Sequence, residues 1–415
     1  MKIIHTSDWH LGARLHEEDR SQEQKSFLDW LLELMMAERP DALVVAGDVF
    51  DVKAPSPQAQ ALYYEFLAKA ATGGLCRRIV VTAGNHDNAK LLAAPSSLLV
   101  ELGICVVSVA GDGEAAKNEV VVVEGKDGNA ALAIAAVPFM FDAELANFGR
   151  GETDADAPRE ERVLAGWAKH YGDVVAAARA AAPGVPLVVT GHCTLTGTVP
   201  SDKTSERHRR IGGIDAYDPK PLAGADYVAL GHLHRSQAVR GYEDRMFYSG
   251  SPLRMSFDEA DCKKHVNVVE LGVAGEPPRV RLVDVPQTVP ILTVEGTPDD
   301  VRARLDGIAA EKDKLLYVRL RLKDFKGEAR PYWEEFRARV QGTGMRVLEE
   351  NDMRPVAPVT AGLKAIAKVG IKNVDPRDLA ERKLRTSSGN FDDTQVSEYM
   401  ALYDMAEEEA KGGAA

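Results

Sequence analysis

Five short apolar segments of this chain each end in Asp, Asn or His. In chain order they read "MKIIHTSDWH", "ALVVAGDVFD", "VVTAGNHDN", "PLVVTGHC" and "YVALGHLH". They are rich in Val and Ile and lack the periodicity of an amphipathic helix, which predicts strands buried on both faces. Ligands of open α/β sheets bind beyond the carboxyl ends of the strands. We therefore expect the polar side chains to form one shared site.

The order of the predicted elements indicates an α/β fold. Apolar residues at helical spacing predict helices in "FLDWLLELMM" and over residues 59–70. Later segments read as further strands, with a tight turn at "EGKDGN" and a long helix ending near Ala182. So many strands do not fit one doubly wound sheet. We predict two packed mixed sheets flanked by helices.

The sequence divides into three parts. Residues 1–285 hold all five polar strand ends, and a boundary follows near Pro286 to Pro290. Residues 290–354 read as β-α-β-α-β, with Thr297 and Asp300 as a helix-start signal. After a Pro-rich stretch, residues 359–415 are predicted to form a helical tail.

Composition narrows the function classes. The chain has 415 residues, 45% of them hydrophobic, and a net charge of −12, which argues against gripping nucleic acid by bulk charge. The basic run "SERHRR" at 205–210 is either a local patch or a solvated loop. No C-x-x-C pair is present, and Cys193 reads as a core thiol although it follows His192. Without a secretory signal or a membrane segment, a cytoplasmic protein is expected.

The polar strand ends offer oxygen and imidazole ligands without a thiolate. Such a set suits Mn²⁺, Fe²⁺ or Zn²⁺ more than calcium. Seven ligands are too many for one ion, but two ions about 3.5–4 Å apart could share them if a carboxylate bridges, which is an arrangement used in phosphoryl-ester hydrolysis. "GHLH" would place two imidazoles on the same side of an extended chain. The seven candidates are Asp8, His10, Asp48, Asn85, His192, His232 and His234.

The motifs D-x-H, G-D-x-x-D, G-N-H-D, G-H and G-H-x-H, in this order, resemble those of the calcineurin-like metallophosphoesterase superfamily. The words "SDWHLG" and "YSGSPLRMSFDE" further resemble its SbcD family, the nuclease subunits of bacterial SbcCD complexes. The resemblance is specific over residues 1–285. It implies a four-layer sandwich, a small capping domain that recognises DNA, and a helical tail that docks the SbcC ATPase.

The same resemblance implies a role for each site residue. One Mn²⁺ would be held by Asp8, His10, Asp48 and His234. The other would be held by Asp48, Asn85, His192 and His232. His86 would stabilise the reacting phosphate or protonate the leaving oxygen. Asp87 would orient His86, and Asp51 would orient a ligand or a water.

The function implied by the resemblance is an Mn²⁺-dependent DNA nuclease of repair, recombination and replication. It would act as a 3'-5' exonuclease on duplex ends and an endonuclease on single strands and hairpins. Its nuclease domain would form a homodimer at the nucleoid, within a heterotetramer holding two copies of each polypeptide.

Two alternatives stay open. One is a small-molecule phosphodiesterase or phosphatase with the same metal site, although such an enzyme needs neither the small domain nor the tail. The other is a non-catalytic scaffold, which is disfavoured because every ligand position is filled. Arg330, Arg337 and Arg339 of the small domain could contact phosphates, but surface ion pairs are the commoner fate of such residues.

Overall fold

The computed structural model describes residues 1–154, 156–199, 214–309, 314–354 and 400. The chain forms two compact units, Met1–Asp352 and Met353–Ala415. The basic run at 205–210 and, apart from Met400, the predicted helical tail lie outside the described residues. In the described part, no helix is both long and apolar enough to cross a membrane.

The first sheet contains three of the strands predicted to carry polar ends. Its strand order is β14-β13-β1-β4-β5-β6. The four strands from β1 to β6 are parallel, while β13 is antiparallel to β1 and β14 to β13. The bounds are β1 (Lys2–Thr6), β4 (Ala42–Ala46), β5 (Arg78–Thr82), β6 (Ile104–Val107), β13 (His265–Glu270) and β14 (Arg279–Asp284).

The second sheet contains the other two strands that were predicted to end in polar residues. Its order is β11-β12-β10-β9-β8-β7. The central pairings β8–β9, β9–β10 and β10–β12 are parallel, and β7–β8 is the hairpin predicted around "EGKDGN". The bounds are β7 (Val120–Glu124), β8 (Ala130–Ala135), β9 (Leu187–His192), β10 (Tyr227–Gly231), β11 (Gln237–Ala238) and β12 (Met246–Tyr248).

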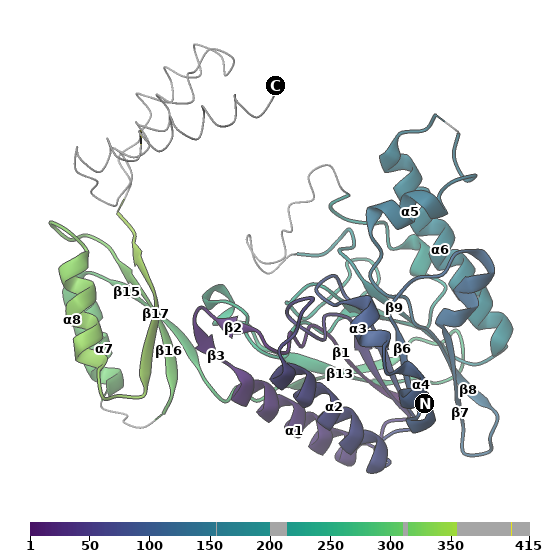
Figure 1. Ribbon diagram of the computed structural model, residues 1–415, viewed down its shortest axis with the longest axis horizontal. Helices are drawn as coiled ribbons and strands as arrows, with labels where there is room; N and C mark the ends of the chain where they lie inside the picture. The colour runs from purple at the N-terminus through teal and green to yellow at the C-terminus, as the bar shows by residue number, and fades with distance from the viewer. Residues whose placement is uncertain (155, 200–213, 310–313, 355–399, 401–415) are drawn as a thin grey trace. The chain divides into compact units, whose positions relative to one another are not determined.

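Helices cover the outer faces of the two sheets. On the first sheet, α1 (Ser21–Glu38) and α2 (Pro57–Thr72) lie side by side (Figure 1) and share its outer core. Ser56 begins α2 by accepting a hydrogen bond from the Ala59 N–H at 3.2 Å, and Pro57 suits the first helical position. On the second sheet, α6 (Arg159–Ala181) packs with α5 (Asp142–Phe148).

The inner faces of the two sheets pack against each other. One buried cluster combines Ile3, Val44 and Val80 of the first sheet with Val188 and Ala229 of the second. The layers therefore run helix, sheet, sheet, helix, which confirms the predicted fold class. The remaining elements of this core are short: β2 (Arg14–Leu15), β3 (Glu18–Asp19), α3 (Ala89–Ala93), α4 (Ser96–Leu99), η1 (Val100–Leu102), η2 (Gly113–Glu119), η3 (Lys220–Leu222) and η4 (Phe257–Glu259).

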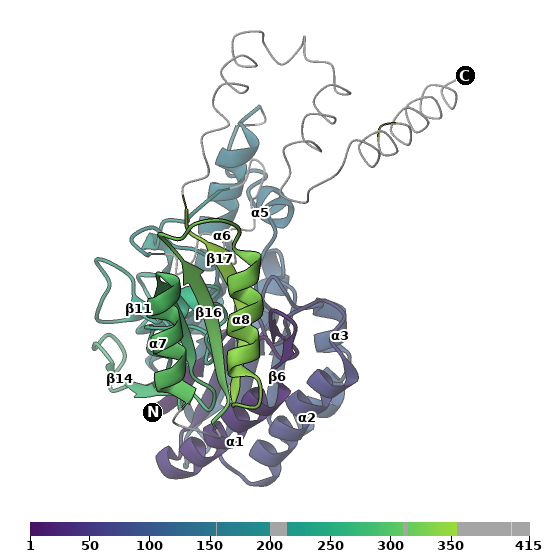
Figure 2. The same ribbon diagram turned by 90° about the vertical axis from the view of Figure 1, so that its left-hand side faces the viewer.

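Residues 291–352 of the first unit, called the small domain below, have the predicted β-α-β-α-β order. Its parallel sheet β15-β16-β17 carries α7 and α8 side by side on one face (Figure 2). At the start of α7, the Thr297 hydroxyl and the Asp300 carboxylate cap each other's backbone N–H groups. The bounds are β15 (Ile291–Gly296), α7 (Pro298–Ala309), β16 (Leu316–Leu322), α8 (Arg330–Val340) and β17 (Met345–Asp352).

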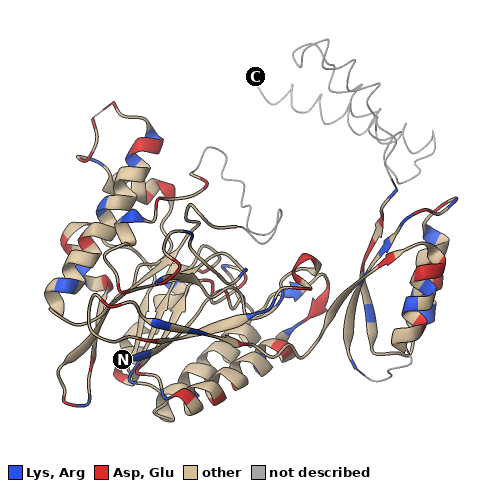
Figure 3. Cartoon of the chain, turned by 180° about the vertical axis from the view of Figure 1, so that it is seen from behind, with Lys and Arg blue, Asp and Glu red and all other residues tan. Residues whose placement is uncertain are grey.

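All three arginines of α8 form ion pairs. Arg330 pairs with Glu334, Arg337 with Glu350, and Arg339 with Asp306, at N–O distances of 3.0, 2.5 and 2.7 Å. Both basic and acidic residues accordingly appear on the helical face of this domain in Figure 3. Of the two fates considered from the sequence, surface ion pairing is the one observed.

Candidate metal centre

The polar side chains gather where strands of both sheets end. Asp8, Asp48 and Asn85 follow β1, β4 and β5, while His192 closes β9 and His232 follows β10. The backbone N–H groups of Asp8 and His10 donate to the carbonyls of Gly47 and Asp48, each at 3.0 Å. These bonds extend the β1–β4 pairing past the sheet, so the loops keep a fixed spacing.

The backbone at this site is held in an unfavourable conformation. Asp8, His10, Asp48 and His232 have φ values of 52°, 45°, 51° and 90°. Left-handed backbone is disfavoured for residues with a side chain, and such strain clusters at functional sites. Four of the seven non-glycine residues with positive φ in the described part belong to the predicted ligand set.

Glycines leave the space that the ligands occupy. A Cβ atom on Gly84 would lie 2.1 Å from Oδ1 of Asp48, and one on Gly47 would lie 2.1 Å from Nδ1 of His192. The Gly that precedes Asp48 and the Gly that precedes Asn85 in the sequence motifs are therefore required by close packing around the ligands.

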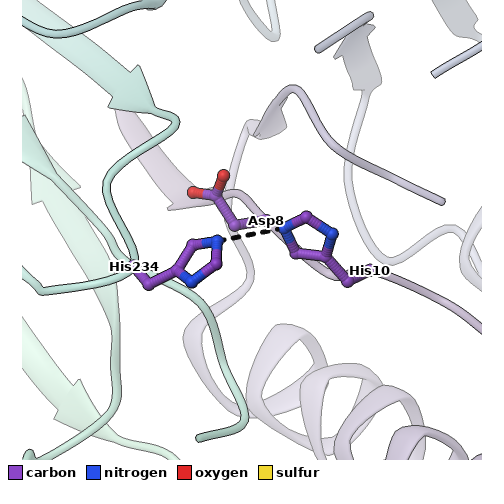
Figure 4. A group of neighbouring side chains, drawn as sticks. All are labelled: Asp8, His10 and His234. Atoms are coloured by element: carbon purple, nitrogen blue, oxygen red, sulfur yellow. Dashed lines mark hydrogen bonds between the residues drawn. The ribbon is translucent and has the colours of Figure 1, made fainter. Parts of the chain in front are cut away.

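The first group of ligands consists of Asp8, His10 and His234. All three are buried, and one ligand atom from each lies within 4.8 Å of the others. The Nε2 atoms of His10 and His234 face each other at 3.2 Å, beside the Asp8 carboxylate (Figure 4). Two imidazole nitrogens and a carboxylate converging in this way fit one divalent cation.

The second group is centred on the Asn85 amide oxygen. Its Oδ1 atom lies 3.1 Å from Nε2 of His192 and 3.0 Å from Nδ1 of His232. The backbone N–H of His232 also donates to Oδ1 of Asp8 at 2.9 Å, which ties this group to the first.

The prediction that "GHLH" is extended is wrong. Strand β10 ends at Gly231, and His232 has a φ of 90°. The two imidazoles nevertheless reach different ligand groups, His234 the first and His232 the second. Alternation along a strand does not apply at this position.

Asp48 lies between the two groups. Its Oδ2 atom is 3.2 Å from Nε2 of His192 and 3.6 Å from Nε2 of His10. Burial would raise the pKa of Asp48, but the neighbouring His192, His10 and His86 hold it well below its usual range. Burial lowers the pKa of His192, yet the Asp48 carboxylate outweighs it and raises that pKa to about 9. This electrostatic environment strongly favours positive charge beside Asp48.

His86 borders the first group. Its ring centroid is 4.9 Å from that of His10, and its backbone N–H donates to Oδ1 of Asp48 at 2.9 Å. The Nδ1 atom lies 2.6 Å from the backbone carbonyl of Asp51. That carbonyl accepts a hydrogen bond from Nδ1.

The Asp87 carboxylate bonds to backbone N–H groups of two loops. It accepts hydrogen bonds from the N–H groups of Val49, Phe50 and Gly84 at 3.2, 2.9 and 2.8 Å. These bonds join the loop after β4 to the loop after β5. The Asp51 carboxylate is near the ligands too, with Oδ1 3.3 Å from Nδ1 of His10.

Four further polar residues surround the first group, and sequence reasoning assigned no role to them. Ser7 bonds to Oδ2 of Asp8 at 2.5 Å and to the Ser249 hydroxyl at 2.7 Å. Glu259 and Lys264 lie behind His234. The words "YSGSP" and "SFDE" contain Ser249 and Glu259, so the motif carried a signal, but no spacing rule connects these residues with Asp8 or His234.

The comparisons with known proteins agree with this geometry. A model of the calcineurin-like phosphoesterase family matches residues 1–236. SbcD of the SbcCD nuclease of Escherichia coli K12 is 33% identical over 310 residues, which cover 74% of each chain. The chain belongs to the SbcD family.

Other SbcD proteins support the assignment. SbcD of the Rhodobacter capsulatus SbcCD nuclease is 35% identical, over 88% of this chain and 84% of its own length. The Bacillus subtilis protein is 36% identical, over 65% and 66%. This member of the SbcD family is thus a metal-dependent nuclease, and its chemistry uses divalent metal ions. The resemblance seen in the sequence is confirmed.

Proposed function

We propose that this chain cleaves the phosphodiester bonds of DNA with two Mn²⁺ ions. The observation that carries the proposal is the position of Asp48, whose Oδ2 atom lies 3.6 Å from a ring nitrogen of His10 and 3.2 Å from one of His192. A carboxylate between two histidine groups can bridge two ions. When bound, such a pair of ions stabilises charge on the attacking and leaving oxygens of the ester.

The ligand groups suggest how the ions are shared. Asp8, His10 and His234 would hold one ion together with Asp48. Asn85, His192 and His232 would hold the other, again with Asp48. Oxygen and imidazole ligands of this kind suit Mn²⁺, Fe²⁺ or Zn²⁺, and the choice of Mn²⁺ among them rests on the family resemblance. The Asp87 bonds between the two loops would keep the groups in register.

His86 would donate the proton that the leaving oxygen takes up. Because the Asp51 carbonyl lies 2.6 Å from Nδ1, Nδ1 carries the hydrogen in the neutral ring, and Nε2 is the atom that would hold or donate a proton. A positioned imidazole can protonate the leaving oxygen as the ester bond breaks. The Asp51 carboxylate would orient His10.

DNA is proposed as the substrate because the relatives are named as nucleases. The ion pairs of α8 do not identify the phosphate contacts, so the role of the small domain in DNA recognition rests on the family resemblance. We propose exonuclease action from the 3' side on duplex ends and endonuclease action on single strands and hairpins. Acting on DNA would place the protein at the nucleoid.

The deciding experiment compares substrates. Purified full-length protein is assayed on linear duplex, single-stranded DNA and bis(p-nitrophenyl) phosphate, each with Mn²⁺ and with Mg²⁺. Mn²⁺-dependent DNA cleavage is expected, and the Asp48→Asn variant controls for contaminating nucleases. Hydrolysis of the small diester with no attack on DNA would favour the small-molecule alternative.

We also propose that residues 359–415 dock an SbcC-type ATPase, in an assembly with two copies of each polypeptide. The support is the relatives' place in a complex named SbcCD. A chain truncated after Arg354 should keep Mn²⁺-dependent cleavage of single strands but fail to co-purify with SbcC. Light scattering on the complex gives the stoichiometry. Full co-purification of the truncated chain would contradict the proposed docking.

A further inference from the structure

A lysine is buried behind the metal centre together with a glutamate. The side chains of Lys264 and Glu259 are 1% and 0% exposed. The Lys264 ammonium donates to Oε2 of Glu259 at 2.6 Å, to the Ser251 hydroxyl at 2.8 Å and to the backbone carbonyl of His234 at 3.0 Å. Buried ion pairs contribute little net stability compared with apolar side chains, which suggests that this pair serves another purpose.

Two of the three partners of Lys264, Glu259 and His234, also face each other. The second oxygen of Glu259, Oε1, faces Nδ1 of His234 at 3.5 Å. The opposite ring nitrogen, Nε2, faces His10 at 3.2 Å in the first ligand group. A carboxylate behind a histidine ligand fixes the tautomer and the orientation of its ring. Lys264 therefore contacts both the main chain of His234 and the carboxylate that faces its ring.

We propose that Glu259 and Lys264 are positioning residues for the metal ion held by Asp8, His10 and His234. This inference rests on the proposed ligand assignment and deepens it. Glu259 keeps the hydrogen of His234 on Nδ1, so that Nε2 presents its lone pair to the ion. Lys264 holds Glu259 in place and neutralises its charge.

The small domain also contacts η4, the short helix that ends at Glu259. Glu259 is the last residue of η4, and Asp258, which precedes it, accepts a hydrogen bond from Nη1 of Arg319 at 2.7 Å. The Arg319 guanidinium also lies over the Phe257 ring, 5.4 Å from its centroid. Arg319 is a buried residue of β16. The position of Glu259 thus depends on both the core and the small domain.

The test measures Mn²⁺ binding to the full-length protein by isothermal titration calorimetry, with metal content after dialysis as a second readout. Lys264→Met and Glu259→Gln should each lower the affinity for one of the two ions about 10–100-fold and leave the affinity for the other unchanged. Arg319→Met should have the same selectivity with a smaller effect. A loss confined to one ion cannot come from general destabilisation.

Glu119→Gln is the matched control. Like Glu259, Glu119 is buried and faces a histidine, with its Oε2 atom 3.1 Å from Nε2 of His170. Glu119 ends η2 and His170 belongs to α6, so neither residue is part of a ligand group. The control should lower stability while keeping both ions at wild-type affinity. If Lys264→Met does not fold, the double variant Glu259→Gln/Lys264→Met is measured in its place, because it removes both buried charges together.

Three outcomes separate the claims. Wild-type binding of both ions by folded Glu259→Gln and Lys264→Met overturns the positioning role. Equal weakening of both ions in these variants overturns it as well. The ligand assignment itself is tested by His234→Ala, which should lose one ion, and a His234→Ala protein that keeps both would overturn the assignment instead.

Discussion

The Oδ2 atom of Asp48 lies 3.2 Å from Nε2 of His192, and both side chains are buried. Since Oδ2 also lies 3.6 Å from His10, Asp48→Asn should lose both metal ions and all measurable nuclease activity. His10→Ala should lose only one ion. Metal analysis by mass spectrometry after dialysis gives the stoichiometry. Two ions in the Asp48 variant would rule out bridging.

His86→Ala should retain both ions and lose about 10²–10⁴-fold in turnover, as expected for a missing acid-base group. The hydrogen bond to Asp48 comes from the backbone N–H of residue 86, so the substitution leaves that contact in place. The measurements are kcat on single-stranded DNA and Mn²⁺ stoichiometry. If the variant loses an ion, His86 is a ligand.

Asp51→Ala should lower the affinity for one ion about 10-fold, because the carboxylate that faces Nδ1 of His10 at 3.3 Å is removed. The carbonyl that bonds to His86 is backbone and stays. Asp51→Asn keeps an oxygen acceptor and should bind Mn²⁺ more tightly than the alanine variant. Calorimetry distinguishes the two, and equal wild-type affinity in both would show that Asp51 does not orient His10.

His5 should make stability depend on pH. Burial lowers the pKa of His5 from 6.5 to about 3, and its Nδ1 atom lies 2.9 Å from the Tyr227 hydroxyl between the sheets. Because the unfolded chain binds the proton more readily, the stability from neutral His5 is complete above pH 6.5 and is lost as the pH falls toward 3.

The measurement compares wild type with His5→Asn by urea unfolding in the presence of a chelator. Between pH 7.5 and 5.5, wild type should lose about 1 kcal/mol more of its free energy of unfolding than the variant does. The proposed metal ligands are the same in both proteins, so their contribution cancels. Identical losses would contradict the prediction.

The gathering of the site could be predicted because it follows from strand geometry alone. Asp8, Asp48 and Asn85 each follow a parallel strand of one sheet, and the carboxyl ends of such strands lie along one edge. The second sheet brings His192 and His232 to the same place. The pattern did not show that the two sheets share one site, but the number of similar strand ends made that the simplest interpretation.

Other features could not be derived from local sequence patterns, even where a family motif contains the residue, as it does for Glu259. Strand β13 pairs with β1, so that Asn267 lies opposite His5, and an apolar run does not specify a partner so distant in the chain. Glu259 and Lys264 are charged residues in a polar stretch, where solvent exposure is the usual expectation. Their burial and their contacts with His234 appear only in the folded structure.

The left-handed backbone at Asp8, His10, Asp48 and His232 has an evolutionary consequence. Each such position costs about 1–3 kcal/mol, while a whole domain is stable by only about 5–15 kcal/mol. Glycine adopts this conformation without strain. A duplicated copy released from the need to cleave DNA could therefore become more heat-resistant by drifting to glycine at those of these positions, such as His10, where no carboxylate accepts a backbone hydrogen bond. Relatives that have lost their ligands need not be decaying proteins, and loss of catalysis and gain of robustness can be the same substitution.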